Sequence, residues 1–194
     1  MFKYLFIISI CFNIFYSQSF FSKFISKNQE FLESPIQYIS FDYTTKNIDV
    51  FSEQEHGKII IGKNRYKIIL KNYIFLVQRT NMKRYNKTTN QIFIEDNNPK
   101  LDSLILNFFN INHLDMVQLE SNGKITSIPS ILNIEDLILD LDFSSDSSSI
   151  KNVNINYNQV SLSIFNLDFS NKKLYSDDLF SFEFPDAFIF DLRD

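Results

Sequence analysis

The chain of 194 residues contains few of the residues that form turns or crosslinks, with 3 glycines, 4 prolines and a single cysteine. It contains no tryptophan. One cysteine, Cys11, cannot form an internal disulfide. Phenylalanine is abundant instead, with 22 copies, and Ala187 is the only alanine. Residues with AT-rich codons dominate this skew, so the asparagine-rich loops carry no functional signature. The length suits one domain with a substantial core.

Positive charge is also scarce. The formal net charge is -4 and the sequence pI is near 5.2. No basic stripe with interleaved aromatic residues stands out along the chain, which disfavours nucleic-acid binding.

Metal-ligating and catalytic patterns are missing as well. His56 has no second histidine near it in the sequence, which favours a turn residue over a metal ligand. The acidic residues Asp140, Asp142 and Asp146 lack the glycine and terminal glutamate of an EF-hand. A secreted hydrolase is disfavoured, because His56 and His113 are the only histidines and no glycine-flanked nucleophile serine occurs. We therefore expect no catalytic residue, no metal and no cofactor.

The first residues predict a secretory signal peptide. Residues 1–3 (MFK) make a short positive start, residues 4–16 are almost wholly apolar, and Ser17 is a small residue at the expected cut. The apolar run is too short to span a bilayer comfortably. We expect residues 1–17 to be the signal peptide and residues 18–194 to form a single domain. An uncleaved N-terminal anchor is the alternative.

The best-organised stretch runs from Gly57 to Ile94 and predicts a meander of about five strands. Within it Tyr66, Ile68 and Leu70 alternate with polar residues, the period-2 pattern of a strand with one dry face. The breaks are rich in Asn, Gly, Thr or Lys, as hairpin connections are. An apolar sheet without recognisable chemistry indicates binding rather than catalysis.

Further strands are predicted on both sides of this meander. Residues 36–43 alternate as a strand, residues 44–47 suggest a turn, and residues 48–55 suggest a second strand. A change of apolar phase near residue 165 indicates either a bulge or a face that becomes buried on both sides. The later strands are expected at residues 137–143, 153–157, 160–169 and 180–184. A shorter strand is possible at residues 125–128, and Phe188, Phe190 and Leu192 close the chain.

Two helices are predicted as well. Residues 19–33 are amphipathic and are ended by Pro35, and residues 100–110 carry Leu104 and Phe108 at helical spacing. The total is about ten to eleven short strands with two helices. Strands joined by hairpins imply an antiparallel sheet, and so many strands must curl or close.

The order of these elements resembles a known family. The likeness rests on the secretory signal, the first helix, the glycine-led strand at 57–61, the basic-aromatic strand at 64–68, the proline-led helix at 99–109, and the closing segments FSFEFP and FIFDLR. In this order the chain resembles the LolA family of periplasmic outer-membrane lipoprotein carrier proteins.

The resemblance implies a mainly β, α+β fold: an antiparallel, strongly curved half-barrel whose concave face is covered by helices, as in LolA and LolB. It implies a carrier in the periplasm of a Gram-negative bacterium that ferries lipoprotein acyl chains from the inner to the outer membrane. The partners would be acylated lipoproteins, an inner-membrane lipoprotein-releasing transporter and an outer-membrane acceptor, with the carrier a monomer. Two alternatives stay open: a divergent relative that binds another lipid, and a secreted structural or adhesive β protein with a filled core.

The resemblance also implies a lipid-binding site. A lid would come from Leu104 and Phe108 of the middle helix. Many family members carry an arginine-proline step that is implicated in latching this lid; residues 62–65 (GKNR) have no proline, so Lys63, Arg65 and Lys67 are alternative candidates for the latch. The alternative for the lining is that its residues simply pack against each other as core. The expected apolar lining is Ile39, Phe41, Ile59, Ile61, Tyr66, Ile68 and Leu70.

Overall fold

The protein was analysed as a computed structural model, which describes residues 23–47, 50–51, 53–78, 81–96, 124–126, 138–144, 148–157, 160–171 and 176–193. These residues form one 12-stranded sheet with short helical segments. The strands are β1 (Gln37–Asn47), β2 (Val50–Phe51), β3 (Glu55–Gly62), β4 (Arg65–Ile69), β5 (Tyr73–Gln78), β6 (Asn81–Asn86), β7 (Gln91–Asp96), β8 (Lys124–Thr126), β9 (Ile138–Phe143), β10 (Ile150–Tyr157), β11 (Val160–Asn171) and β12 (Phe188–Asp191).

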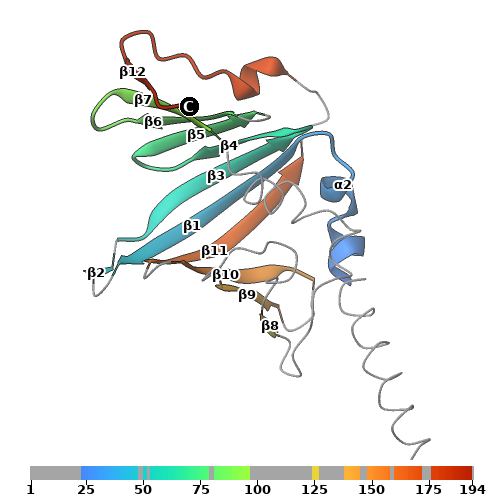
Figure 1. The fold of residues 1–194 in the computed structure, drawn as a ribbon. Coiled ribbons are helices and arrows are strands. Elements are labelled where there is room, and N and C mark those ends of the chain that lie inside the picture. Colours follow the sequence, from blue (N-terminus) through green and yellow to red (C-terminus); the bar gives the residue numbers. More distant parts are fainter. Residues whose placement is uncertain are drawn as a thin grey trace, which may run out of the picture.

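The sheet is strongly curved and open (Figure 1). Its strand order is β12-β7-β6-β5-β4-β3-β1-β11-β10-β9-β8, with β2 paired to β1. Among the described residues the end strands β12 and β8 do not pair with each other, so the sheet stays a half-barrel. The predicted mainly β, curved and largely antiparallel fold is therefore confirmed.

Strand β1 lies at the centre and fixes which residues face inward. Ile39 pairs with Ile59 on β3 and with Phe169 on β11. Because side chains alternate along a strand, Phe41 shares the concave side with Ile39. The register of β1 against β11 shifts between Ser40 and Asp42. The facing β11 residue Asn166 has a φ of 53°, in the left-handed region, which confirms the bulge predicted from the change of apolar phase.

The meander is confirmed strand by strand. β3, β4, β5, β6 and β7 pair in sequence, each antiparallel to the next. Their tight turns use left-handed asparagines, with a φ of 58° at Asn64 and 53° at Asn90. Asparagine tolerates this conformation better than most residues, which explains its place at these turns.

Three predicted segments are wrong. Residues 44–47 are not a turn: they extend β1, because Asn47 still pairs with Val160 of β11. Of the strand expected at 48–55, the described residues include the two residues of β2 and the first residue of β3, whereas residues 53 and 54 are irregular. Residues 180–184 do not form a strand: the 3-10 helix η1 (Asp177–Phe180) is followed by irregular chain.

Residues 180–184 do not form a strand because of the way Phe180 packs. Phe180 is 3% exposed and packs on the convex face with Ile36, Tyr38 and Ile60. The chain therefore crosses the outside of the meander before it reaches the sheet edge. As a result β12 runs parallel to β7, where hairpin logic predicts an antiparallel pair.

The first helix is confirmed over the part that the structure describes. Residues 23–27 are helical and α2 (Gln29–Leu32) follows after a break at Asn28, whose side-chain amide donates to the Phe24 carbonyl at 2.9 Å. The predicted helix at 100–110 and the predicted signal peptide lie outside the described residues. None of the described helices has the length and apolarity needed to cross a membrane.

Candidate functional site

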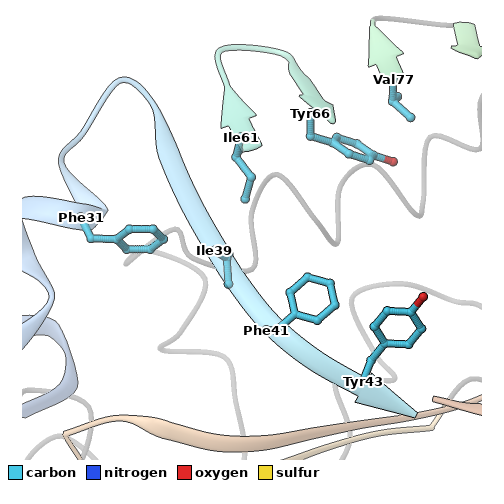
Figure 2. Packing of buried hydrophobic residues seen from close by; sticks show 7 residues of the cluster. All are labelled: Phe31, Ile39, Phe41, Tyr43, Ile61, Tyr66 and Val77. Carbon is cyan, nitrogen blue, oxygen red and sulfur yellow. The ribbon is translucent and has the colours of Figure 1, made fainter. Parts of the chain in front are cut away.

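The predicted apolar lining is brought together on the concave face. These side chains come from β1, β3, β4 and Leu70 just after β4; Ile59 faces Ile68 and Ile61 faces Tyr66. Figure 2 shows members of this group pointing into a common space on one side of the sheet. All the lining residues predicted in the meander and β1 belong to one packed cluster: Ile39, Phe41, Ile59, Ile61, Tyr66, Ile68 and Leu70.

The structure adds three buried residues that the sequence argument left out of the lining. Phe31 comes from α2, Tyr43 from β1 and Val77 from β5. The signals were present for two of them: Tyr43 continues the β1 alternation, and Val77 faces Tyr66 once β4 and β5 pair. Phe31 required the docking of the helix on the sheet, which is a tertiary event.

The apolar face continues onto the other half of the sheet. Phe24, only 1% exposed, packs there on Leu141 of β9 and on Ile150 and Val153 of β10. The β11 residues Ile164, Leu167 and Phe169 pack against both this cluster and the first one. One apolar surface therefore runs from β9 across β1 to β5, with the N-terminal helical segment lying on part of it.

The centre of this surface is closed. Ile39 is 1% exposed, and Phe41, Ile61 and Tyr66 are each 6% exposed or less. Ile59, Ile68 and Leu70 are only partly buried. A ligand would therefore reach the centre only after a movement that uncovers it.

A polar group borders the apolar face where Tyr43 of β1 pairs with Glu55 at the start of β3. Tyr43 donates its hydroxyl to Oε2 of Glu55 at 2.5 Å, and Lys71 Nζ lies 3.2 Å from Oε1 of the same carboxylate. Burial, and the hydrogen bond to Glu55, raise the pKa of Tyr43 to about 12. The hydrogen bond from Tyr43 lowers the pKa of Glu55. A protonated Tyr43 and an ionised Glu55 thus form a hydrogen-bonded pair at the border of the apolar surface.

Two of the latch candidates, Arg65 and Lys67, lie on the opposite side of the sheet. Lys63 is exposed in a turn. Arg65 lies 4.3 Å from the centre of the Phe180 ring, and Lys67 donates to the Ser181 carbonyl at 2.7 Å. Burial lowers the pKa of Lys67. These contacts bind the C-terminal segment to β4; the lid residues Leu104 and Phe108 lie outside the described residues, so the latch stays a prediction.

A hollow of about 650 Å³ lies near the ends of the β4–β5 and β6–β7 hairpins, and its lining mixes three lysines with apolar side chains. His56 lines it from β3, not from a turn as predicted, with Nδ1 3.2 Å from Oδ1 of Asp42. The amide of Asn166, and then His56, lower the pKa of Asp42. In the described part of the chain no three His, Cys, Asp or Glu side chains gather as a metal site would require. The hollow is lined by Tyr38, Ser40, His56, Gly57, Lys58, Ile69, Leu70, Lys71, Lys87, Ser170 and Asn171.

Neither a known family model nor a curated protein sequence matches the chain. Several solved structures are similar to it. An uncharacterized conserved protein from Thermus thermophilus is 9% identical, with 90% of this chain and 98% of that one covered and a TM-score of 0.47. A LolA superfamily protein from Nitrosomonas europaea is also 9% identical, with 82% and 96% covered and a TM-score of 0.44.

A DUF1329 family protein from Desulfovibrio piger is 10% identical, with 84% of this chain and 96% of that one covered and a TM-score of 0.45. A LolA superfamily protein is thus among the similar structures. Likeness at this level concerns the arrangement of the strands alone. The assignment of the fold rests on the strand pairing described above, and the site has to be argued from its own residues.

Proposed function

We propose that the protein binds the acyl chain of a lipid on the concave face of its sheet. The observation that carries this proposal is the continuity of the apolar surface from β9 to β5. Burial of an acyl chain stabilises a complex by about 0.8 kcal/mol per methylene. A long apolar surface without catalytic groups is suited to such a ligand, because the gain grows with chain length and needs no polar anchor.

Binding requires part of the concave face to open. The partly buried residues Ile59, Ile68 and Leu70 mark the side where a chain would enter. Phe31 and Leu32, both on α2, would exchange contacts with the sheet for contacts with the lipid. The exchange costs little, since one apolar contact replaces another.

The finer proposal is that of a periplasmic carrier. The protein would take acylated lipoproteins from an inner-membrane releasing transporter and pass them to an outer-membrane acceptor in a Gram-negative bacterium, after removal of a signal peptide. This part is supported by the order of sequence elements that resembles the LolA family. A divergent carrier of another lipid fits the same concave face.

A matched pair of variants on one strand tests lipid binding. Ile68 and Ile69 are neighbours on β4, with Ile68 in the concave cluster and Ile69 packed against the convex one. The protein is produced from the full chain, stripped of lipid and titrated with a dansyl-labelled fatty acid. We expect Ile68→Ser to weaken binding about tenfold or more, since a loss of about 1.4 kcal/mol gives that factor. The control Ile69→Ser should bind the fatty acid as the wild type does. Thermal melting of both variants shows whether their losses of stability are comparable.

The competing candidate is a structural β protein with a filled core. The low exposure of Ile39, Phe41 and Tyr66 favours it. Native mass spectrometry of the freshly purified protein separates the two. Co-purified lipid and saturable dye binding support the carrier. A lipid-free protein that takes up neither fatty acid nor dye up to its melting temperature would identify the concave face as an ordinary core.

A further inference from the structure

The end of the sheet at β12 is apolar and exposed. β12 closes the strand order, and among the described residues no strand pairs with its outer edge (Figure 1). Phe188 is 69% exposed, Ile189 63%, Phe190 41% and Leu192 57%. Edge strands are usually protected by short length, charged side chains, proline or a bulge. β12 is four residues long and carries Asp191, but residues 188–192 contain no lysine or proline, and its pairing with β7 has no bulge. We propose that β12 pairs antiparallel with β12 of a second copy of this chain.

The hydrogen bonds to β7 leave one set of backbone groups directed outward. The Phe188 amide donates to the Asn90 carbonyl at 3.0 Å, and the Leu192 amide donates to the Ile94 carbonyl at 2.9 Å. In a parallel ladder alternate residues bond to the same neighbour, so Phe190 also faces β7. The N–H and C=O groups of Ile189 and Asp191 therefore point away from the sheet.

One symmetric register uses the outward groups of both residues in both copies. Ile189 of one copy lies opposite Asp191 of the other, and each such pair exchanges both N–H···O bonds. The two-fold axis then passes between the two Phe190 residues, which form a pair without hydrogen bonds. The contact is isologous, so it closes at two copies and does not grow into a filament.

The side chains fit this register. Phe188, Phe190 and Leu192 share one face of the strand, where the Phe190 ring stacks on that of Phe93 at 5.3 Å. Pairing sets Phe188 opposite Leu192 of the second copy and Phe190 opposite its own counterpart, so that one apolar row covers another. No like charges face each other, because Asp191 lies opposite Ile189 and is already bound to Arg193.

The area available indicates a weak dimer. A phenylalanine buries about 150–250 Å² when fully covered. The exposed parts of the four apolar side chains then offer each copy roughly 400 Å², about half of what a standard stable interface contributes per partner. We expect association in the micromolar range or weaker, in contrast to the monomer expected from the family resemblance. The contact uses the sheet edge and does not depend on lipid binding.

Single cysteines test the register. The protein is produced from the full chain with Cys11→Ser, and Phe190→Cys then supplies the one thiol. Residues of a pair without hydrogen bonds lie about 4.5 Å apart between Cα atoms, within the range that a disulfide spans. Oxidation should convert most of Phe190→Cys into a covalent dimer. The matched control Ile189→Cys, also exposed, is displaced from its own counterpart by two residues and should crosslink several-fold less.

A proline tests the hydrogen bonds. Ile189→Pro removes an outward N–H and leaves the bonds to β7 intact. Sedimentation equilibrium from low micromolar to submillimolar protein should find a dimer for the wild type and for Ile189→Ala, and a monomer for Ile189→Pro. The proposal is overturned by a wild type that stays monomeric throughout, by a dimer indifferent to the proline, or by equal crosslinking of the two cysteine variants. Melting curves establish whether each variant is folded. If Ile189→Pro does not fold, the crosslinking of the two cysteine variants tests the β12 pairing.

Discussion

The hydroxyl of Tyr43 offers the sharpest test of how the border of the concave face is held. Tyr43 is 5% exposed and its hydroxyl lies 2.5 Å from the Glu55 carboxylate. A hydrogen bond to a charged acceptor contributes about 1.5–3 kcal/mol. We therefore expect Tyr43→Phe to lower the free energy of unfolding by about 2 kcal/mol near pH 7. A double-mutant cycle with Glu55→Gln should assign most of that loss to the pair.

The pH dependence follows from the two shifted groups. The pKa of Tyr43 is raised from 10.0 to about 12, so at high pH the folded state keeps a proton that the unfolded state has lost. Stability from this group is complete below pH 10 and falls by about 2–3 kcal/mol as the pH rises toward 12. The pKa of Glu55 is lowered from 4.5, so its contribution is present above pH 4.5 and is lost as the pH falls through the lowered value.

Urea unfolding measures the free energy of unfolding at acidic, neutral and strongly alkaline pH. The alkaline measurement lies between the pKa of Tyr43 in the unfolded chain, 10.0, and its pKa in the folded protein, about 12. The gap between wild type and Tyr43→Phe should be largest at neutral pH and narrow at both extremes. Lys71→Met is the control on the same carboxylate. The Lys71 side chain is 57% exposed, so its removal should cost at most about 1 kcal/mol. A Tyr43→Phe cost below about 0.5 kcal/mol, or one that stays constant from neutral to strongly alkaline pH, would refute the reasoning.

Three further substitutions probe packing and turns. Gly57→Ala should cost about 1–3 kcal/mol in urea unfolding, because an added Cβ would lie 2.5 Å from the Phe41 ring; an unchanged midpoint would contradict this. Asn64→Ala should cost about 1–2 kcal/mol at its φ of 58°, whereas Asn64→Gly should be near neutral in the same assay. Lys67→Met removes the bond to the Ser181 carbonyl, so amide exchange in residues 176–186 should accelerate while that in the meander is unchanged; uniform exchange would argue against this contact as a tether.

The sequence was informative wherever a strand has one dry face and a short turn. The alternation of Tyr66, Ile68 and Leu70 and the asparagine turns were sufficient to predict β3 to β7 and most of the lining. Prediction from the sequence failed where a partner strand far along the chain determines how long a strand is. Residues 44–47 have the composition of a turn, yet Val160 is available on β11 and extends β1 to Asn47.

The C-terminal segment shows the same limit. Phe180, Phe182 and Phe184 alternate as in a strand, but Phe180 packs on the convex face beside Gly62, where an added Cβ would lie 2.9 Å from its ring. The alternating pattern predicts that these phenylalanines are buried, but it does not predict the surface on which they pack. The direction of β12 was likewise unpredictable, since a parallel pair depends on how the chain returns to the sheet.

The sequence alone determined a predominantly β chain with no internal disulfide, a central meander and a set of inward apolar residues, because these follow from composition and period-2 spacing. Only the tertiary structure decided that these residues form one surface from β9 to β5, that the helical segment with Phe24 and Phe31 covers part of it, and that β12 ends the sheet with an exposed edge. The physical reason is that local spacing fixes the side of a strand on which each residue lies, whereas pairings between distant strands fix what that side meets.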